Sequence, residues 1–252
     1  MLPALFIGHG SPMNALEDNK FTQTWKALAL SLPKPGSILV ISAHWETHGT
    51  FISTNSNPQT IHDFGGFPPE LHNYHYLAPG NTEIATRIAD KLEINTDLKM
   101  GLDHGAWSVL CQMYPDADIP VFQLSQDITK TPQEHFDFGQ KLQHLREEGV
   151  LILGSGNIVH NLGAMNWENP NQPYSWACEF NNIIVDNIQK REFENVIQFE
   201  KYGSISKNSV PSPEHFYPLL YVLGTAKPDD MIKIFNNELI MGSLSMTGVK
   251  IG

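Results

Sequence analysis

Near the start of the chain, residues 4–10 read Ala4-Leu5-Phe6-Ile7-Gly8-His9-Gly10, four consecutive apolar residues and then a histidine between two glycines. A continuous apolar run of this length, without polar alternation, is typical of a strand that is covered on both faces in a parallel sheet. Three other short runs share the pattern: Ile38–Ile41, Val121–Leu124 and Val150–Leu153. The sequence therefore predicts a central sheet that is mainly parallel.

Amphipathic stretches with apolar residues near a 3.6-residue period lie between and after these runs. They are Phe21–Leu32, Thr82–Leu92, Pro132–Glu147, Tyr174–Ile188 and His215–Leu223. Strands that alternate with helices predict an α/β fold in which helices flank both faces of the sheet. Ile232–Phe235 and Leu244–Met246 are expected to be late antiparallel strands. Because the chain has no internal repeat, linker or shift in composition, we expect residues 1–252 to form a single domain.

Composition restricts the class of protein. The formal net charge is -11, and nucleic-acid binding requires clustered basic side chains that this chain lacks, so we expect no nucleic-acid partner. No apolar stretch approaches the roughly 20 residues of a membrane helix, and the first residues do not resemble a signal peptide. Cys111 and Cys178 have no CxxC partner and are expected to be buried thiols in a reducing compartment. These features predict a soluble cytoplasmic protein, either a monomer or a small homo-oligomer.

Four histidines follow strands or open a late helix in the predicted order of elements. They are His9, His44, His160 and His215. Side chains beyond the carboxyl ends of parallel strands converge at one edge of the sheet, where α/β proteins bind their ligands. Neutral imidazole is the commonest protein ligand of transition metals. Any one of these histidines could be a core or capping residue, but together they predict one mononuclear metal site.

Other segments are candidate walls of that site. Thr60–Pro68 is a loop rich in glycine and aromatic residues that contains the pair His62-Asp63, and long loops of this kind often bind ligands. His104 lies at a predicted helix start, where the helix dipole favours a neutral imidazole suited to hydrogen bonding or proton transfer. Asp103 is at least as well explained as the cap of that helix. Trp45 could pack against a flat substrate or belong to the core. His135 and His144 are expected on the solvent side of their helix.

Two common types of site fit poorly. Gly8-x-Gly10 follows a strand, but Met13 occupies the third glycine position of a dinucleotide-binding motif. Ser11 could form a hydrolase triad with Asp103 and His104, but the nitrogen of the next residue, a proline, cannot donate to an oxyanion.

The chain resembles the class III extradiol ring-cleavage dioxygenases, in particular their bacterial branch related to plant DOPA 4,5-dioxygenase. The matching stretches are Gly8–Met13, Ser42–Trp45, Thr60–Pro68, Asp103–Trp107, Ser155–Leu162, Pro213–His215 and Gly242–Met246. They span nearly the whole chain. The resemblance implies an oxidoreductase that opens the ring of a DOPA-like catechol and incorporates both atoms of dioxygen.

The resemblance also implies roles for individual residues. His9 and His44 are expected to bind the metal, while His160 acts as the acid/base residue and could also complete the coordination sphere. The third ligand in the wider family is a glutamate, but here the matching position is His215. His104 would be a second catalytic residue, and the substrate-binding residues would be His62, Asp63, Trp45 and Ser11.

The metal and two alternative functions stay open at this point. Two histidines and a carboxylate are typical of non-haem Fe(II) oxygenases, whereas a set made of histidines alone equally suits Zn(II). A zinc-dependent hydrolase could therefore use the same pocket, because Zn(II) activates bound water. A binding protein without catalytic activity is the other alternative.

Overall fold

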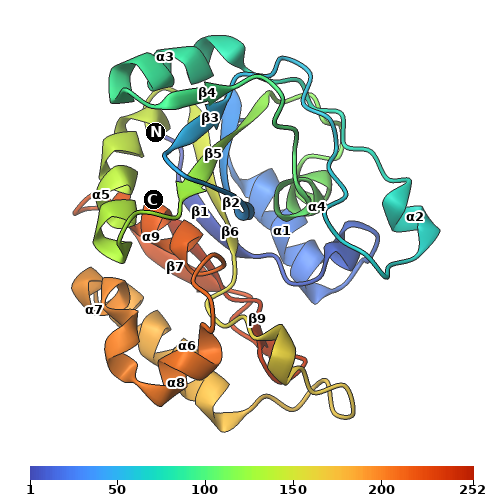
Figure 1. Cartoon of the computed structure of the whole chain (residues 1–252), viewed down its shortest axis with the longest axis vertical. Coiled ribbons are helices and arrows are strands. Elements are labelled where there is room, and N and C mark those ends of the chain that lie inside the picture. Colours follow the sequence, from blue (N-terminus) through green and yellow to red (C-terminus); the bar gives the residue numbers. More distant parts are fainter.

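The fold is built on one eight-stranded sheet in a computed structural model that describes residues 1–252. The strand order is β4-β3-β5-β2-β6-β1-β10-β7 (Figure 1). The four central strands run parallel: β5 (Val121–Asp127), β2 (Ser37–Thr47), β6 (Val150–Gly156) and β1 (Ala4–Gly8). At one edge β10 (Gly248–Ile251) pairs antiparallel with both β1 and β7 (Ile232–Phe235). At the other edge β3 (Phe51–Ser53) pairs antiparallel with β5 and parallel with β4 (Asn95–Asp97). This arrangement confirms the predicted mainly parallel sheet.

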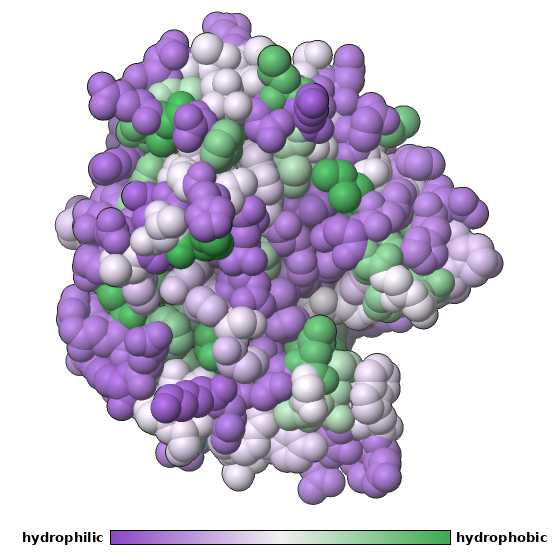
Figure 2. Space-filling model, in the orientation of Figure 1, coloured by the Kyte–Doolittle hydropathy of each residue, from purple (hydrophilic) through white to green (hydrophobic).

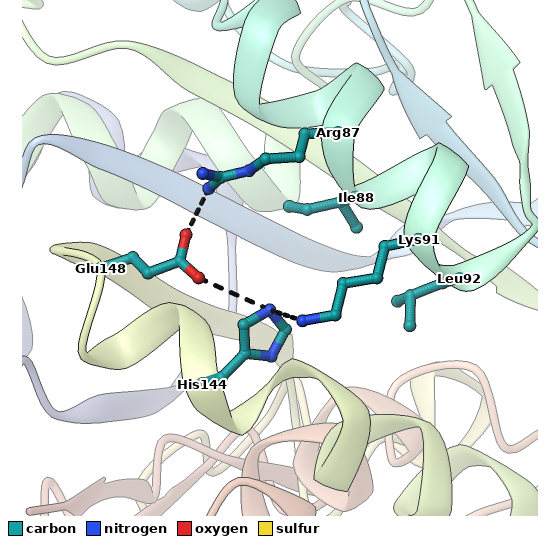
Figure 3. A pocket seen from close by; sticks show the side chains of 6 residues that line it. All are labelled: Arg87, Ile88, Lys91, Leu92, His144 and Glu148. Carbon is teal, nitrogen blue, oxygen red and sulfur yellow. Dashed lines mark hydrogen bonds and ion pairs between the residues drawn. The ribbon is translucent and has the colours of Figure 1, made fainter.

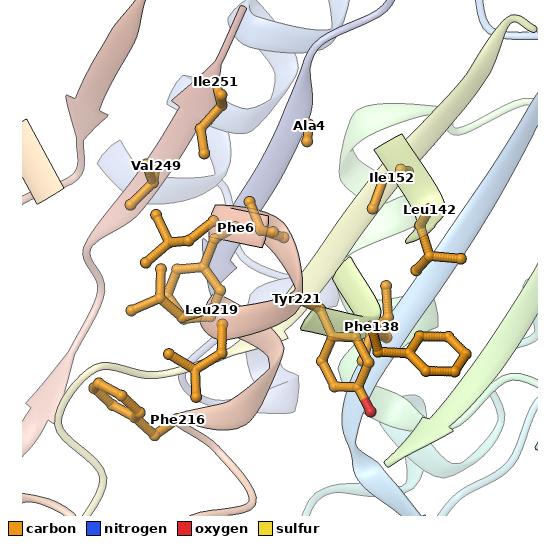
Figure 4. Packing of buried hydrophobic residues seen from close by; sticks show 14 of the residues in the cluster. Ala4, Phe6, Phe138, Leu142, Ile152, Phe216, Leu219, Tyr221, Val249 and Ile251 are labelled. Atoms are coloured by element: carbon orange, nitrogen blue, oxygen red, sulfur yellow. The ribbon is translucent and has the colours of Figure 1, made fainter. Parts of the chain in front are cut away.

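Helices cover both faces of the sheet because successive side chains of its strands point to opposite sides. In β1, Leu5 and Ile7 join the apolar cluster beneath α1 (Lys20–Ser31) and α4 (His104–Met113). Phe6 of the same strand joins the other cluster, where it packs with residues of α9 (Tyr217–Gly224) and α5 (Pro132–Leu142) (Figure 4). This second cluster also includes residues of α3 (Thr82–Leu92) and α6 (Ser175–Gln189). The predicted three-layer α/β fold is therefore confirmed.

Shorter elements complete the chain. They are α2 (Pro69–His72), α7 (Phe193–Ile197), α8 (Ser204–Ser209), and a small separate sheet of β8 (Leu239–Ile240) and β9 (Leu244–Ser245). Both predicted late strands do pair antiparallel, but β7 pairs with β10 and β9 with β8. No helix in the chain has the length and apolar character needed to cross a bilayer.

Two strands extend further than their apolar runs indicate. β2 continues through His44 to Thr47, with a change of register against β5 between Ile41 and Glu46. His44 therefore lies within the strand, on the more exposed side of an alternating stretch, and not beyond its end. β6 likewise includes the glycines up to Gly156, and His215 precedes the first residue of α9 by two positions.

The structure corrects two expectations about buried polar side chains. His135 is fully buried, and its Nδ1 lies 2.9 Å from the hydroxyl oxygen of Tyr221 on α9, so it does not face solvent. Cys178 is only partly buried, although Cys111 is in the core as expected. The packing of α9 on α5 explains the first correction, because it covers a helix face that looks polar in sequence.

The two ends of the chain meet at one side of the sheet. Arg146 is fully buried and donates hydrogen bonds to the backbone oxygens of Leu2 and Ile251, while its guanidinium pairs with Asp230. These bonds add to the pairing of β1 with β10, which places the first strand beside the last one.

Candidate metal centre

A cavity of about 560 Å³ lies at the carboxyl edge of the parallel strands. The surface of the molecule is indented between the arm that carries α2 and the part of the chain that contains β9 (Figure 2). The cavity is lined by residues that are far apart in sequence, namely His9, Gly10, Ser11, Pro12, His44, Asp63, Phe64, Phe67, His104, His160, Leu162, Met165, Trp167, His215, Ile240, Met241 and Leu244. All four histidines singled out from the sequence are among them.

Three of these imidazoles have the mutual spacing expected of ligands to one ion. The ring centres of His9 and His44 lie 5.2 Å apart, those of His9 and His215 5.3 Å, and those of His44 and His215 4.9 Å. With metal–nitrogen bonds of about 2.0–2.1 Å, ring centres lie about 3.2 Å from the ion and about 4.5–5.2 Å from one another. The Nε2 atoms of His9 and His44 are 3.3 Å apart, which also suits two ligands of one ion. The donor set present therefore fits a single metal.

Hydrogen bonds fix the tautomer of two of these rings. The hydroxyl of Ser155 donates to the backbone oxygen of Gly105 at 2.5 Å, so its oxygen accepts from Nδ1 of His9 at 3.0 Å. Nδ1 of His215 lies 2.9 Å from a carboxylate oxygen of Glu214, to which it donates. In both rings Nε2 is then left with its lone pair, the form in which imidazole binds a metal.

Asp63 connects two histidines at one side of the cavity. One of its carboxylate oxygens accepts a hydrogen bond from the backbone nitrogen of His104 at 3.0 Å. The other lies 2.9 Å from Nδ1 of His104, out of line for a hydrogen bond, and 3.8 Å from Nδ1 of His44. The rings of His104 and His44 pack with their centres 3.8 Å apart. Asp103 caps α4 by accepting from the backbone nitrogen of Ala106, so its capping role is confirmed.

His160 occupies the opposite side of the cluster. Its ring stacks on that of His215 with a centre-to-centre distance of 3.4 Å and an angle of 7°. Its backbone forms a bridge to Leu244 and donates to the oxygen of Ser209, which fixes the start of this loop. Possible ligand atoms of His160, Glu214 and His215 lie within 4.8 Å of one another, as do those of His9, His44 and His104.

Burial favours the neutral form of His9, His44, His160 and His215 by lowering the pKa of each imidazole. Desolvation, followed by the mutual repulsion of neighbouring imidazoles, lowers the pKa of His9 and of His215 well below the usual value. The same causes lower the pKa of His44 to about 3. Desolvation lowers the pKa of His160 to about 4, although the nearby Glu214 carboxylate opposes the shift. Desolvation would raise the pKa of Asp63, but the close contact of its carboxylate with the ring and the backbone nitrogen of His104 lowers it on balance. Metal binding requires the neutral form of histidine, which these surroundings favour.

Two of the predicted substrate-binding residues do not line the cavity. Trp45 is buried on β2, and His62 uses its Nε2 to contact the backbone oxygen of Tyr74 at 2.9 Å. Ser11 and Asp63 do line it, and Phe64 and Phe67 show that the loop 60–68 forms one wall. The opposite wall was not anticipated. It consists of residues from two segments, Leu162–Trp167 and Ile240–Leu244. Only the first segment could have been noticed in the sequence, because it has large apolar residues just after His160.

A second hollow, of about 80 Å³, lies apart from the histidine cluster, between α3 and the segment 144–148 (Figure 3). Arg87 pairs there with Glu148, and Lys91 lies 3.1 Å from Nε2 of His144. Its charged groups are largely satisfied by one another, so the larger cavity is the candidate functional site.

Comparisons with known proteins agree with this geometry. A bacterial relative, the "4,5-DOPA dioxygenase extradiol" of Escherichia coli K12, is 46% identical over 100% of this chain and 95% of its own length. A relative of the same name in Beta vulgaris is 40% identical over 97% of this chain and 94% of its own length. The crystal structure of an uncharacterized Escherichia coli K12 protein, 42% identical, superposes with a TM-score of 0.87 and covers 100% of both chains. Residues 3–249 match the family described as the catalytic LigB subunit of aromatic ring-opening dioxygenase, and this chain belongs to that family of extradiol dioxygenases.

Proposed function

We propose that this extradiol dioxygenase opens the ring of a DOPA-like catechol and that it uses one Fe(II) ion held by His9, His44 and His215. The convergence of these three rings, with centres 4.9–5.3 Å apart at the base of one cavity, is the observation that carries the proposal. The names of the bacterial and plant relatives, both called 4,5-DOPA dioxygenase extradiol, support the class of substrate.

Three neutral histidines suit Fe(II) and Zn(II) alike, so the choice of metal rests on the reaction. Bound Fe(II) supplies the redox chemistry that dioxygen requires and the positive charge that stabilises a catecholate, whereas Zn(II) has no redox chemistry. We therefore propose Fe(II) as the working ion. The two oxygens of the diol would enter the cavity toward the three histidines, and the rest of the ring would lie between the two walls.

His160 is proposed as the residue that moves the proton. The rings of His160 and His215 stack with their centres 3.4 Å apart, so their nitrogen lone pairs lie in two nearly parallel planes, which disfavours one ion shared by both rings. A neutral His160 can instead accept a proton from one catechol hydroxyl and return it when the ring opens next to the diol. On the other side, Asp63 faces Nδ1 of His104, which leaves Nε2 of His104 for a hydrogen bond to the substrate.

We also propose that residues 1–252 act as one catalytic domain. The cavity takes lining residues from His9 near the start to Leu244 near the end, so its walls need both the first and the last part of the chain. Neither cysteine forms a disulfide, which suits the reducing cytoplasm proposed as the location of the enzyme, as a monomer or small homo-oligomer.

Reconstitution tests the proposed function. The metal-stripped protein is loaded with Fe(II) or Zn(II) without oxygen, and oxygen uptake is then followed with a panel of catechols that includes DOPA. We expect Fe(II)-dependent uptake of one dioxygen per catechol and a coloured semialdehyde product. Activity that requires Zn(II) and consumes no oxygen would instead indicate the hydrolase, and metal binding without any turnover would indicate a binding protein.

A further inference from the structure

The outer walls of the cavity are apolar. Phe64 and Phe67 form one side, and Leu162, Met165, Trp167 and Met241 belong to the other. Leu162 is 59% exposed and Trp167 is 74% exposed, although both are large apolar side chains. Exposed apolar residues that gather around a hollow commonly mark a binding site. A bound ring substituent would therefore contact mainly hydrocarbon and aromatic surface.

The cavity also lacks a basic side chain. No lysine or arginine is among its lining residues, and the one lining carboxylate, Asp63, faces His104 and His44. The chain as a whole carries a net charge of -11. A bound metal would be met by the two diol oxygens at the histidine end of the cavity, and not by the ring substituent between the apolar walls. A carboxylate on the ring substituent would thus lose water at this site without gaining a cationic partner, which is unfavourable.

We infer that the site selects catechols by the charge of the ring substituent, so that it favours apolar or cationic substituents and rejects anionic ones. This inference rests on the proposed function and narrows its substrate class. DOPA carries both an ammonium group and a carboxylate, so we expect its affinity to lie between those of cationic and anionic catechols. The specificity would come from the walls formed by the loop 60–68 and the segment 162–167, and not from the histidines.

The inference is tested by oxygen-free calorimetry on the Fe(II)-loaded protein with four catechols of similar shape. They are 4-ethylcatechol, which is neutral, dopamine, which is a cation, DOPA, which is a zwitterion, and 3,4-dihydroxyphenylpropionate, which is an anion. We expect the anion to bind at least about tenfold more weakly than 4-ethylcatechol, because its carboxylate is desolvated without a partner. Equal affinity for these two compounds would overturn the inference. Oxygen uptake, measured separately, tests the proposed function: if no catechol is opened, that function fails while the ranking of affinities still stands.

A charge added to the mouth of the cavity gives a second test. Leu162→Arg places a guanidinium at the cavity wall, and Leu162→Gln is its neutral control. We expect the affinity for the anion, relative to 4-ethylcatechol, to be about tenfold higher in the arginine variant than in the glutamine variant. Leu30→Arg adds the same charge on α1 at a side chain that is 88% exposed and outside the cavity, and should keep the wild-type ratio. An unchanged ratio in a folded Leu162→Arg protein would contradict the inference.

Discussion

Each proposed metal ligand is oriented by a neighbouring side chain that accepts a hydrogen bond from its second ring nitrogen or from its backbone nitrogen. Ser155 accepts from Nδ1 of His9, and Glu214 accepts from Nδ1 of His215. Ser42 accepts from the backbone nitrogen of His44 at 3.2 Å and donates to the buried Asp103 at 2.6 Å. Partners of this kind orient the rings and can raise their basicity toward a metal. The proposed ligand set contains no carboxylate, but the carboxylate of Glu214 is hydrogen-bonded to the ligand His215 through Nδ1 of its ring.

Glu214→Gln tests this arrangement. The amide oxygen can still accept from Nδ1 of His215, but it no longer carries the negative charge that increases the basicity of the ring. We expect metal affinity, measured by competition with a chelator, to fall about tenfold or more, with the fold unchanged by circular dichroism. Glu168→Gln, at an exposed position outside the cavity, is the control. If both variants bind metal equally well, Glu214 has no such role.

His160→Ala separates proton transfer from metal binding. Because the three proposed ligands remain, the variant should retain one metal per chain, as measured by elemental analysis. Loss of the acid/base residue should lower kcat by about 10²–10⁴-fold. His75→Ala, an exposed histidine outside the cavity, should retain full activity. Loss of the metal from the His160→Ala protein would show instead that His160 is a ligand.

The sequence predicted that His9, His44, His160 and His215 meet because each of them follows an apolar run or precedes a helix in a recognisable motif. The prediction that His135 faces solvent was wrong. His135 has polar neighbours in its own helix, but Tyr221 of another helix covers it. The sequence also left open whether Trp45 faces the cavity or the core. In both cases burial depends on a segment far away along the chain, which local periodicity does not reveal.

At the level of elements, two features were the hardest to predict: the residues at which strands end, and the cavity wall formed by residues 162–167 and 240–244. The apolar runs gave the starts of β2 and β6 but not their polar and glycine-rich ends. The wall formed by residues 240–244 is held at the site by the bridge between His160 and Leu244 and by backbone hydrogen bonds from Asn161 to Ser243 and from Asn166 to Met241. Long-range pairing of such short segments has no local signal, because two or three residues are too few to show a period.

Close packing of α5 on α9 gives a testable element-scale prediction. A β-carbon at Gly139 would lie 2.1 Å from the backbone oxygen of Tyr221, so the two helices approach through this glycine. In an exposed helix, Gly→Ala stabilises by about 1 kcal/mol, but here overpacking should dominate. We expect Gly139→Ala to lower the free energy of unfolding by about 1–3 kcal/mol in urea titrations. Asp137→Ala, on the exposed face of α5, should change it far less. A stabilised Gly139→Ala protein would show that the helices can separate at little cost.

At the level of the whole molecule, two of the places where the fold buries ionisable groups differ in how they avoid an uncompensated charge. Arg146 links the two ends of the chain, and its partners at Leu2, Asp230 and Ile251 satisfy its charge and hydrogen bonds. The histidine cluster differs, because its members avoid charge by remaining neutral. Stability of the metal-free protein should therefore depend on pH near neutrality, where histidine titrates in the unfolded chain.

The direction of this dependence follows from the lowered pKa values. His9, His44, His160, His215 and His135 all have a pKa below the usual 6.5 in the folded protein, with desolvation as the first cause. Below pH 6.5 the unfolded chain binds protons at these positions that the folded chain does not bind, so falling pH favours unfolding. Each group contributes a slope of up to about 1.4 kcal/mol per pH unit. Asp103 and Glu46, whose pKa is raised by burial, act in the opposite direction but are fewer.

Urea unfolding of the metal-free protein between pH 7.5 and pH 5.0 measures this effect. We expect a free energy of unfolding that is constant above about pH 7 and falls steadily as the pH is lowered further. His135→Gln removes one buried imidazole outside the metal site, so its slope should be smaller than that of the wild type while metal binding is retained. Bound metal should steepen the decline, because protons compete with the ion for the same nitrogens. A free energy of unfolding that stays level or rises toward pH 5 would mean that these imidazoles are already charged in the folded protein, and the neutral ligand set would then be wrong.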